Sequence, residues 1–532
     1  MKFQFPLALV LVAGCNSLDK KDKTTENDQE GQRPNILFIM SDDHAQKAIS
    51  AYDSTLIKTP NIDRIANEGA LFANSFVANS ISSPSRAVML TGKHSHKNGV
   101  KDNRQRFDSS QVTFPKLLKQ AGYYTAMIGK WHLKSNPTGF DYWNILNDQG
   151  DYYNPDLIEM GDTIHHTGYV TDIITDLTIK TLDNRDKDKP FCLLYHHKAP
   201  HRTWMPDTAD LRLFEDKEFP LPDNFFDDYE GRKAAKEADM RIKDMFYSWD
   251  MKLQPGQYEE ESEKGGSGPK HYDFIESMAE RWLGRMTPEQ RKAWDNYYLP
   301  RNNVFTELDL KGKELAKWMY QRYMHDYLKC IVSVDRNIGR VLEYLEENDL
   351  MDNTIIVYTS DQGFYLGEHG WYDKRFMYEE SFRTPLLIRY PKEIKAGTTI
   401  HEMVQNIDYA PTFLNLAGEK ITEEIQGRSL RPLWQETDPQ WRDALYYHYY
   451  EYPHGWHYVN KHDGIRTERH KLIHFYEMGE WELYDLKKDA NEMNNLYGNP
   501  RYTKLADSLK TELQNLRASY DVGNIEYADS PK

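Results

Sequence analysis

Short, continuous runs of apolar residues recur along the chain, and longer amphipathic stretches separate them. The apolar runs lie at residues 35–40, 124–128, 191–195, 354–358 and 386–388. Continuous runs are typical of strands that are buried on both faces of a parallel sheet. The stretches between them predict helices at residues 60–70, 113–120, 168–182 and 315–348. Alternating strands and helices predict an α/β fold with helices on both faces of a large, mostly parallel sheet.

Two later regions depart from this pattern. Residues 205–312 are polar and rich in Asp, Glu, Lys and Trp, and the Gly-Gly-Ser-Gly-Pro run at 265–269 predicts a loop. We interpret this region as an insertion that shapes the rim of a substrate site. After about residue 430, short aromatic runs precede a predicted helix at 502–516. We therefore expect a catalytic domain over residues 34–430 and a smaller α+β subdomain with an antiparallel sheet over residues 431–532.

The first residues have the pattern of a lipoprotein signal peptide. Lys2 is followed by a mostly apolar stretch to residue 13 that is too short to span a bilayer. The residues Leu-Val-Ala-Gly-Cys at 11–15 resemble a bacterial lipoprotein box, in which Cys15 becomes lipidated. An ordinary cleaved signal with an incidental cysteine is the alternative. Residues 16–33 are then a polar tether, and a lipid on Cys15 would hold the protein on a membrane surface.

Composition and charge narrow the function. Over 532 residues, aromatic side chains make up 13% of the chain, which indicates a folded globular protein. The net charge of −16 argues against a general nucleic-acid binder but not against an anionic substrate, since a local cluster of cations can override the global sign. Cys192 and Cys330 have no metal-binding spacing, and we expect them to pack in the interior.

The stretch Ser-Ser-Pro-Ser-Arg at residues 82–86, followed by Leu-Thr-Gly at 90–92, carries the first chemical signal. A serine before a proline is typical of a helix N-cap, and proline suits the first helical turn, so the sequence predicts that a helix begins here. Free N–H groups and the positive end of the helix dipole at such a position favour an anionic ligand. By itself the pattern fits either a polar turn or a reactive site.

Carboxylates follow two of the predicted core strands. Asp42 and Asp43 come after the first strand, and Asp361 and Gln362 come after the strand at 354–358. Ligands of open α/β sheets bind at the carboxyl ends of the strands, and carboxylate and amide oxygens are ligands that Ca²⁺ prefers. A turn with a helix cap is the alternative for either pair taken alone.

These segments together resemble the type I sulfatases. The residues at 82–92 follow the pattern S-x-P-S-R-x-x-x-L-T-G, and residues 122–132 resemble the family's second signature. Lys198-Ala199-Pro200-His201 and Asp373-Lys374-Arg375 match further family segments, and the resemblance extends from residue 34 to the strand at 482–486. It implies an alkaline-phosphatase-like fold and hydrolysis of sulfate esters.

The resemblance also implies a role for each matched residue. Ser82 would be oxidised to formylglycine, the hydrate of which is the nucleophile, with Arg86 beside it. His132 would act as a base, His201 would protonate the leaving alcohol, and Lys130 and Lys374 would bind the sulfate. The implied calcium ligands are Asp42, Asp43, Asp361, Gln362 and the modified Ser82. Gln362 departs from the Asn or His that is more frequent in the family.

Within the family, the chain looks most similar to the glucosamine-6-sulfatases. This similarity implies an exo-acting enzyme that removes the 6-O-sulfate of N-acetylglucosamine from heparan sulfate or mucin glycans. Besides Lys130, His201 and Lys374, the C-terminal residues expected to bind the sugar are His454, Trp456, His457, His462 and Arg466. A surface strand that packs on the main domain is the alternative for these five residues.

Other interpretations stay open. An uronate 2-O-sulfate or a galactose 6-O-sulfate is an alternative substrate, and a phosphoester hydrolase with unmodified Ser82 or an inactive glycan-binding lipoprotein is an alternative function. Ser82 could also stand in place of a cysteine in an inactive variant. The expected partners are a sulfated glycan, an anaerobic sulfatase-maturating enzyme and, through lipid alone, a membrane. We expect the protein in the periplasm or on the cell surface of a bacterium, anchored to the outer membrane.

Overall fold

The first strand divides its side chains between two hydrophobic cores. In the computed structural model, which describes Met1 and residues 33–258, 282–438 and 440–523, β1 (Asn35–Ser41) is buried along its whole length. Leu37 and Ile39 pack in a core on one face of the sheet, and Phe38 and Met40 pack in the core on the other face. Successive side chains of a strand point to opposite faces, so a strand covered on both sides needs apolar residues at every position.

Within the described residues, β1 lies near the middle of a ten-stranded sheet with the order β11-β2-β10-β9-β1-β8-β4-β5-β6-β7. The central strands β9, β1, β8, β4 and β5 are parallel, whereas β10, β6 and β7 pair antiparallel with their neighbours. The mostly parallel sheet is therefore confirmed. The remaining strands are β2 (Ala70–Phe72), β4 (Tyr124–Gly129), β5 (Tyr142–Leu146), β6 (Asp156–Glu159), β7 (Asp162–His165), β8 (Phe191–His196), β9 (Thr354–Ser360), β10 (Leu386–Arg389) and β11 (Thr398–Ile400).

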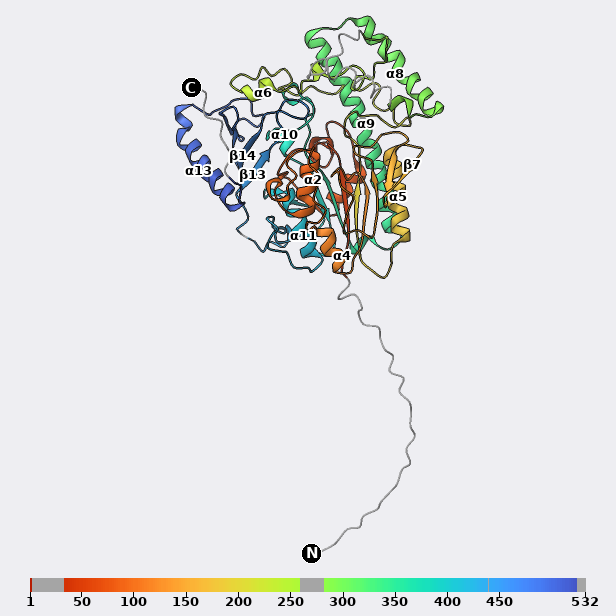
Figure 1. Cartoon of the computed structure of the whole chain (residues 1–532), viewed down its shortest axis with the longest axis vertical. Helices are drawn as coiled ribbons and strands as arrows, with labels where there is room; N and C mark the ends of the chain where they lie inside the picture. Colours follow the sequence, from red (N-terminus) through yellow and green to blue (C-terminus); the bar gives the residue numbers. More distant parts are fainter. Residues whose placement is uncertain (2–32, 259–281, 439, 524–532) are drawn as a thin grey trace. The chain divides into compact units, whose positions relative to one another are not determined.

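Helices cover both faces of this sheet (Figure 1). The core on one face contains residues of α1 (Pro60–Asn67), α5 (Val170–Asn184) and α9 (Gly312–Glu347). The core on the other face contains residues of α2 (Ser82–Thr91), α4 (Phe114–Gln120) and α11 (Tyr409–Leu416). The first helix is shorter than the expected 60–70 because Ala70 already begins β2.

The described part of the region at 205–312 carries few regular elements. The α-helices described there are α6 (Lys233–Glu237) and α8 (Pro288–Leu308), and α8 begins with a capping box between Thr287 and Gln290. Trp294 and Tyr298 of α8 belong to the same core as α9. The loop expected at 265–269 lies outside the described residues. The other short elements of the main sheet region are β3 (Ser75–Phe76), α3 (Ser95–Asn98), α10 (Glu379–Phe382), β12 (Val404–Gln405) and α12 (Arg431–Trp434).

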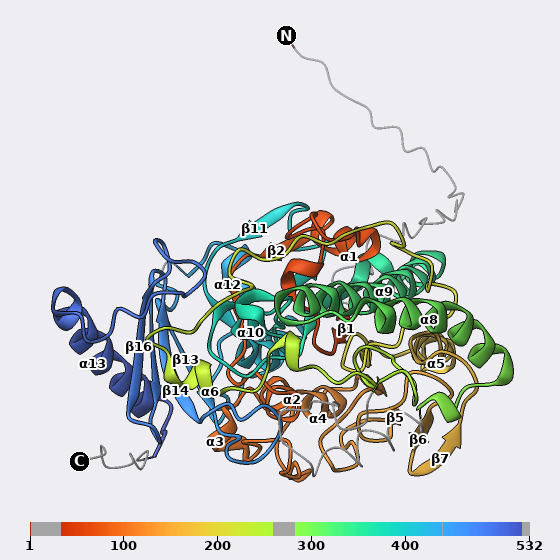
Figure 2. The ribbon, with the colours of Figure 1, turned by 90° about the horizontal axis from the view of Figure 1, so that it is seen from above.

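The C-terminal region forms the expected antiparallel sheet. Its strands are β13 (Ala444–Tyr449), β14 (His462–Thr467), β15 (His470–Phe475) and β16 (Glu480–Asp485), in this order. One face packs on α13 (Thr503–Ser519), which lies on the outer side of the sheet (Figure 2). The other face shares a core with Phe376 and Tyr378 of the main sheet region. The C-terminal sheet is thus fixed to the region that precedes it.

Three expectations concern single features of the chain. The signal peptide with Cys15, and nearly all of the tether at 16–33, lie outside the described residues. In the part of the chain that the structure describes, no helix combines the length and the apolar character needed to cross a bilayer. Cys192 and Cys330 are fully buried, and burial raises the pKa of the Cys330 thiol to about 12.

Candidate active site

Two pairs of polar residues meet at the carboxyl ends of the central strands. Asp42 and Asp43 follow β1, Asp361 and Gln362 follow β9, and the two strands are paired along their whole length. The backbone N–H of Asp43 donates a hydrogen bond to Oδ1 of Asp361 at 3.1 Å. All four side chains are fully buried. The parallel register therefore converts two separate sequence segments into one oxygen-rich cluster.

This cluster fits a divalent cation. Burial and the mutual repulsion of the carboxylates raise the pKa of Asp43 to about 6 and that of Asp361 to about 7. Gln362 donates its amide N–H to Asp43, which leaves its buried Oε1 without a hydrogen-bond partner in the described protein. Oxygen atoms of Asp42 and Asp43 also lie within 4.8 Å of a ring nitrogen of His201. Three carboxylates and an unused amide oxygen are a hard-oxygen donor set of the kind that Ca²⁺ prefers.

Ser82 opens α2 directly beside the cluster. The structure corrects one sequence expectation: Ile81 is the N-cap residue, and no side chain caps the helix. Ser82 lies in the first turn instead, and its hydroxyl donates to Oδ1 of Asp42 at 3.3 Å. The side chain is only 1% exposed. Position 82 therefore combines contact with the carboxylate cluster and proximity to the N–H groups of a helix N-terminus.

Three basic side chains surround the carboxylates, and each contacts one of them. The pairs are Arg86 with Asp361 at 3.0 Å, Lys130 with Asp42, and Lys374 with Asp43 at 2.7 Å. Burial opposes charge on Lys374, but Asp43 and Asp373 outweigh it and raise the pKa of Lys374 above its usual value. Three cations balance three carboxylates, so a bound dication would leave the site positive and suited to an anionic group.

The segment after β4 brings Lys130 and His132 into the site in an unexpected conformation. A Cβ at Gly129 would lie 1.9 Å from the carbonyl oxygen of His196, and Gly129 has φ +98°, so only glycine fits the end of this strand. His132 has φ 55°, which departs from the extended segment that the sequence predicts. The side chain of Trp131 turns away, as expected, and its indole N–H donates to Ser135.

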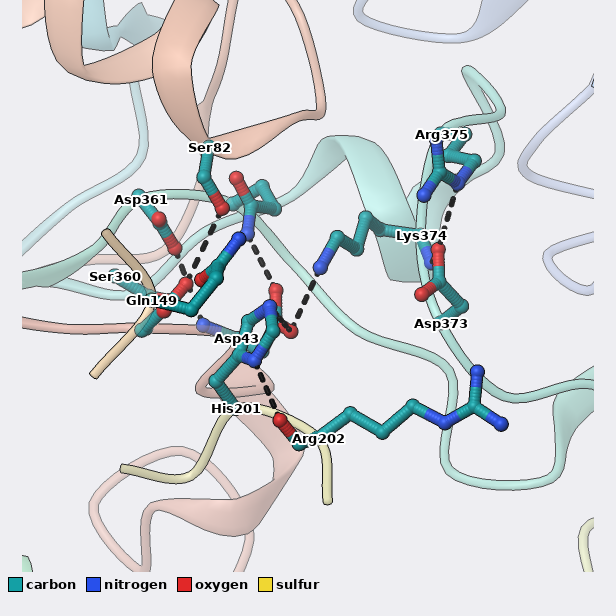
Figure 3. Close-up of polar contacts among 12 residues, drawn as sticks. Asp43, Ser82, Gln149, His201, Arg202, Ser360, Asp361, Asp373, Lys374 and Arg375 are labelled. Atoms are coloured by element: carbon teal, nitrogen blue, oxygen red, sulfur yellow. Dashed lines mark hydrogen bonds and ion pairs between the residues drawn. The ribbon is translucent and has the colours of Figure 1, made fainter. Parts of the chain in front are cut away.

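His132 and His201 are both neutral in this environment. Burial, together with the charge of Lys130, lowers the pKa of His132 and of His201 well below the usual value. His201 Nε2 lies 3.8 Å from Oδ2 of Asp43, and its Nδ1 lies 2.7 Å from the carbonyl oxygen of Arg202. The close-up in Figure 3 shows Ser82, Lys374 and His201 around Asp43. A neutral imidazole is ready to accept a proton.

A cavity of about 620 Å³ opens over this cluster. Its floor includes Ser82, His132, His201 and Lys374. The residues that line the rest are Asn103, Arg104, Lys134, residues 147–151, Lys198, Arg202, Thr203, Trp249, Trp282, Asp373, Arg375, Glu451, Gly455, Trp456 and His457. One end of the cavity is therefore charged and buried, and the other carries three tryptophans.

The structure separates the five C-terminal residues that the sequence proposes for sugar binding. Trp456 and His457 line the cavity, and His457 Nε2 lies 3.3 Å from Oδ2 of Asp373. His454 is exposed and is not part of the lining. The expectation has to be corrected for His462 and Arg466, which lie on β14 inside the C-terminal sheet.

The partners of these two residues explain the correction. His462 is fully buried and accepts a hydrogen bond from the backbone N–H of Met377 at 3.1 Å. The guanidinium of Arg466 pairs with Glu379 at 3.3 Å and stacks on the ring of Phe76. Both side chains therefore fasten the C-terminal sheet to the main sheet region, which is the packing alternative that the sequence left open.

Sequence reasoning missed several lining residues. Gln149 contacts both Lys130 and His132, and Arg202 is stacked between Phe246, Trp249, Tyr372 and Trp456. Asp373 and Arg375 contact each other at 2.9 Å. Both residues flank Lys374, so the Asp-Lys-Arg run in the sequence indicated that they could belong to the same site. Gln149 and Arg202 carry no comparable signal in the sequence.

Comparisons with known proteins match this chain to sulfatases. The family model for sulfatases matches residues 34–419, and the model described as N-sulphoglucosamine sulphohydrolase, C-terminal, matches residues 367–519. An N-acetylglucosamine-6-O-sulfatase of Bacteroides thetaiotaomicron is 52% identical over 527 residues, which is 97% of this chain and 90% of that protein. The human N-acetylglucosamine-6-sulfatase is 25% identical over 79% of this chain and 67% of its own length.

Solved structures extend the comparison to three dimensions. One protein, solved in complex with its substrate D-glucosamine-2-N,6-O-disulfate, matches with a TM-score of 0.88 and 52% identity over 93% of this chain and 99% of its own. A phosphonate monoester hydrolase of Agrobacterium radiobacter matches with a TM-score of 0.66 at 20% identity, over 92% of this chain and 96% of its own. The second likeness shows a shared fold alone.

Proposed function

The chain belongs to the sulfatase family, and we propose that it removes the 6-O-sulfate from glucosamine residues of a glycan, with an N-acetyl or an N-sulfate group on the sugar. The observation that carries the proposal is the continuity of the match to relatives of this specificity. The match covers 97% of this chain at an overall identity of 52%, so it spans the segments of the chain that line the cavity. The cavity closes on the charged cluster, which fits an exo-acting enzyme.

The basic residues would bind and stabilise the sulfate group. Lys374 lines the cavity floor, whereas Lys130 is fully buried next to it and paired with Asp42, and Arg86 is held by Asp361 beside Ser82. Fixed positive charges stabilise the negative charge that builds up on the sulfuryl oxygens as the ester bond breaks. Losing one such preorganised donor typically costs roughly 10²–10³ in rate.

The two histidines divide the proton transfers. His201 stands at the edge of the cluster with Nε2 toward the cavity floor and would protonate the leaving sugar oxygen. Its lowered pKa leaves it neutral when the site is empty. A bound sulfate offsets the charges of Lys130 and Lys374, so we expect the substrate to raise the proton affinity of His201 on binding. His132 would hold the proton that leaves the nucleophile.

Two groups complete the chemistry when they are present. A formylglycine at position 82 supplies a hydrated aldehyde as the nucleophile, and a divalent cation held by Asp42, Asp43, Asp361 and Gln362 supplies positive charge beside it. The buried position of Ser82 and the unpartnered Oε1 of Gln362 support this assignment. The serine at this position further supports maturation by an anaerobic sulfatase-maturating enzyme.

We also propose a location for the enzyme. The lipoprotein box that ends at Cys15 supports lipid anchoring to the bacterial outer membrane, in the periplasm or on the cell surface. Acylation should be visible by mass spectrometry of the N-terminal peptide from membrane fractions. A Cys15→Ser variant should lose the lipid and leave the membrane fraction.

The decisive experiment is desulfation by protein that has been produced with the maturase. We expect formylglycine at position 82 by peptide mass spectrometry and sulfate release from N-acetylglucosamine-6-sulfate and glucosamine-2-N,6-O-disulfate. Galactose-6-sulfate, a 2-O-sulfated uronate and a phosphate monoester serve as comparison substrates. Faster turnover of a galactose or uronate sulfate would overturn the proposed specificity. Turnover of the phosphate ester by unmodified Ser82 protein would overturn the proposed chemistry.

A further inference from the structure

Gln149 lies between two residues of the active site without a role of its own in the chemistry described above. It belongs to the loop that connects β5 and β6, and its side chain lines the cavity. The loop is held in place because Lys198 donates from Nζ to the carbonyl oxygen of Gln149 at 3.1 Å. Figure 3 shows Gln149 among the side chains of the site.

The contact with Lys130 fixes which end of the amide faces which neighbour. Lys130, paired with Asp42, is an ammonium group, and an ammonium group has donors only. It donates to Oε1 of Gln149 at 2.5 Å. The NH₂ end of the amide must therefore face the other way, where Nε2 of Gln149 lies 2.9 Å from Nε2 of His132. An amide NH₂ cannot accept a hydrogen bond, so this ring nitrogen of His132 must be the one that carries the lone pair.

An independent contact on the other side of the ring requires the same tautomer. The hydroxyl of Ser83 donates its single proton to the carbonyl oxygen of His132 at 2.6 Å. The hydroxyl oxygen of Ser83 also lies 3.3 Å from Nδ1 of His132. Because its proton is already donated to the carbonyl oxygen, this hydroxyl can only accept a hydrogen bond from Nδ1. The proton of a neutral imidazole must then be on Nδ1. Gln149 and Ser83 thus impose one proton position from opposite edges of the ring.

We propose that Gln149 and Ser83 are positioning residues that hold His132 in the Nδ1–H tautomer, with the lone pair of the base on Nε2. This inference rests on the proposed function for the catalytic importance of His132, but the tautomer itself does not depend on it. Through Gln149, the lysine that binds the sulfate and the histidine that takes the proton share one hydrogen-bonded chain. The tautomer of a catalytic histidine decides which nitrogen can act, so a residue that sets it controls the base without touching the substrate.

Nitrogen NMR of the full chain with ¹⁵N-labelled histidine tests the tautomer directly. His132 is assigned by the signal that disappears in His132→Gln. We expect a bare Nε2 and a protonated Nδ1 in the wild type. In Gln149→Glu the new carboxylate can only accept, so we expect a proton on Nε2. A protonated Nε2 in the wild type, or an unchanged bare Nε2 in Gln149→Glu, would overturn the proposal.

Kinetics supply the second readout. Gln149→Glu should lower kcat by roughly 10²-fold at neutral pH with little change in KM, because the base is occupied by a proton. Gln149→Met keeps the size of the side chain but donates nothing, and we expect a mixture of tautomers and an intermediate kcat. The control is Asp148→Asn, a neighbouring exposed residue with Oδ1 at 3.6 Å from His132 Nε2, which should keep the wild-type tautomer.

The two measurements also separate this inference from the proposed function. A wild type that shows the expected tautomer but desulfates no sugar would support the positioning role of Gln149 and Ser83 and refute the proposed function. If the wild type is active and both Gln149→Met and Gln149→Glu retain the tautomer and the full kcat, the positioning role alone would be refuted.

Discussion

The two ends of the active-site cavity are built in opposite ways. At the sulfate end, Ser82, Lys130 and Asp361 are almost completely buried and come from strand ends and a helix start in the main sheet region. At the sugar end, Trp249 comes from an irregular segment between α6 and α8, and Trp456 comes from the loop between β13 and β14. These tryptophans are packed around the guanidinium of Arg202, which Asp250 holds at 2.6 Å.

The difference separates the requirements of catalysis from those of recognition. Buried charges are tolerable only when every partner is in place, so the sulfate end needs positions that regular structure fixes on all sides. The aromatic end contributes faces and edges, which bind a sugar ring without an exact set of opposite charges. We therefore expect substitutions at the sulfate end to act on kcat and substitutions at the sugar end to act on KM.

The largest effect should come from Ser82 itself. Ser82→Ala removes the group that we propose becomes the nucleophile, so kcat for N-acetylglucosamine-6-sulfate should fall by roughly 10⁴-fold or more. Sulfate release in a stopped assay measures the loss, and binding of the substrate by calorimetry serves as the control for an intact cavity. Residual activity within tenfold of the wild type would contradict the role of position 82.

Lys374 should give the next largest effect. Lys374→Ala removes an ammonium group that is paired with Asp43 and that we propose binds the sulfate, and we expect kcat/KM to fall by roughly 10²–10³-fold. Lys134 is the matched control because it also lines the cavity but is exposed. Lys134→Ala should change kcat/KM by no more than about fivefold. Equal losses in the two variants would mean that general electrostatic attraction, and not a fixed contact, matters at this end.

Binding of the proposed cation at the sulfate end should depend on pH in a predictable direction. Without it, Asp43 and Asp361 have pKa values of about 6 and about 7 when folded, against 3.8 when unfolded. Between these values the folded state binds more protons than the unfolded state, so the stability of the cation-free protein falls as pH rises. Calcium, the cation that we propose for this cluster, would relieve the repulsion between the ionised carboxylates. Its gain in Tm should therefore be larger at pH 8 than at pH 5, by about 2 °C or more.

Differential scanning fluorimetry of chelator-treated protein, with and without added Ca²⁺, measures this difference. Asp361→Asn removes one of the two carboxylates that have a raised pKa. It should reduce both the increase in Tm on adding calcium and the pH dependence of that increase. A gain in Tm that is equal at the two pH values, or larger at pH 5, would show that protons do not compete with the cation at this cluster.

The sulfate end is also the part that could be predicted from the sequence. Asp42 and Asp43 follow an apolar run, and parallel pairing of β1 with β9 brings them to Asp361 without further information. Local patterns also predict β1, β4, β8, β9 and β10, because each of these strands contains a continuous run of apolar residues. The start of α2 was placed less exactly, since the contact of Ser82 with Asp42 overrides its tendency to cap a helix.

The sugar end could not be predicted in the same way. Arg202 meets Trp456 only after irregular segments far apart in the sequence fold over the main sheet region. His462 and Arg466 stand near Trp456 in the sequence, but β14 pairs on both sides and carries them into the interior. Residues that are close along the chain share a site only where no strand separates them. The aromatic runs around residue 460 did not indicate where β14 begins, so this separation could not be predicted.

The smallest effect should come from the sugar end and should fall on a different kinetic constant. Trp456 is half-buried, lies against Trp249 with a ring distance of 5.8 Å, and lines the cavity. Trp456→Ala should raise KM by about tenfold, equivalent to about 1.4 kcal/mol, and leave kcat nearly unchanged, because the contact is the same before and during the reaction. The matched control is Tyr458→Ala, which removes an exposed aromatic residue of the same loop that does not line the cavity. Initial rates over a range of N-acetylglucosamine-6-sulfate concentrations separate the two constants. A fall in kcat at constant KM in Trp456→Ala would mean that the aromatic end positions the reacting ester, and the division between the two ends of the cavity would then be wrong.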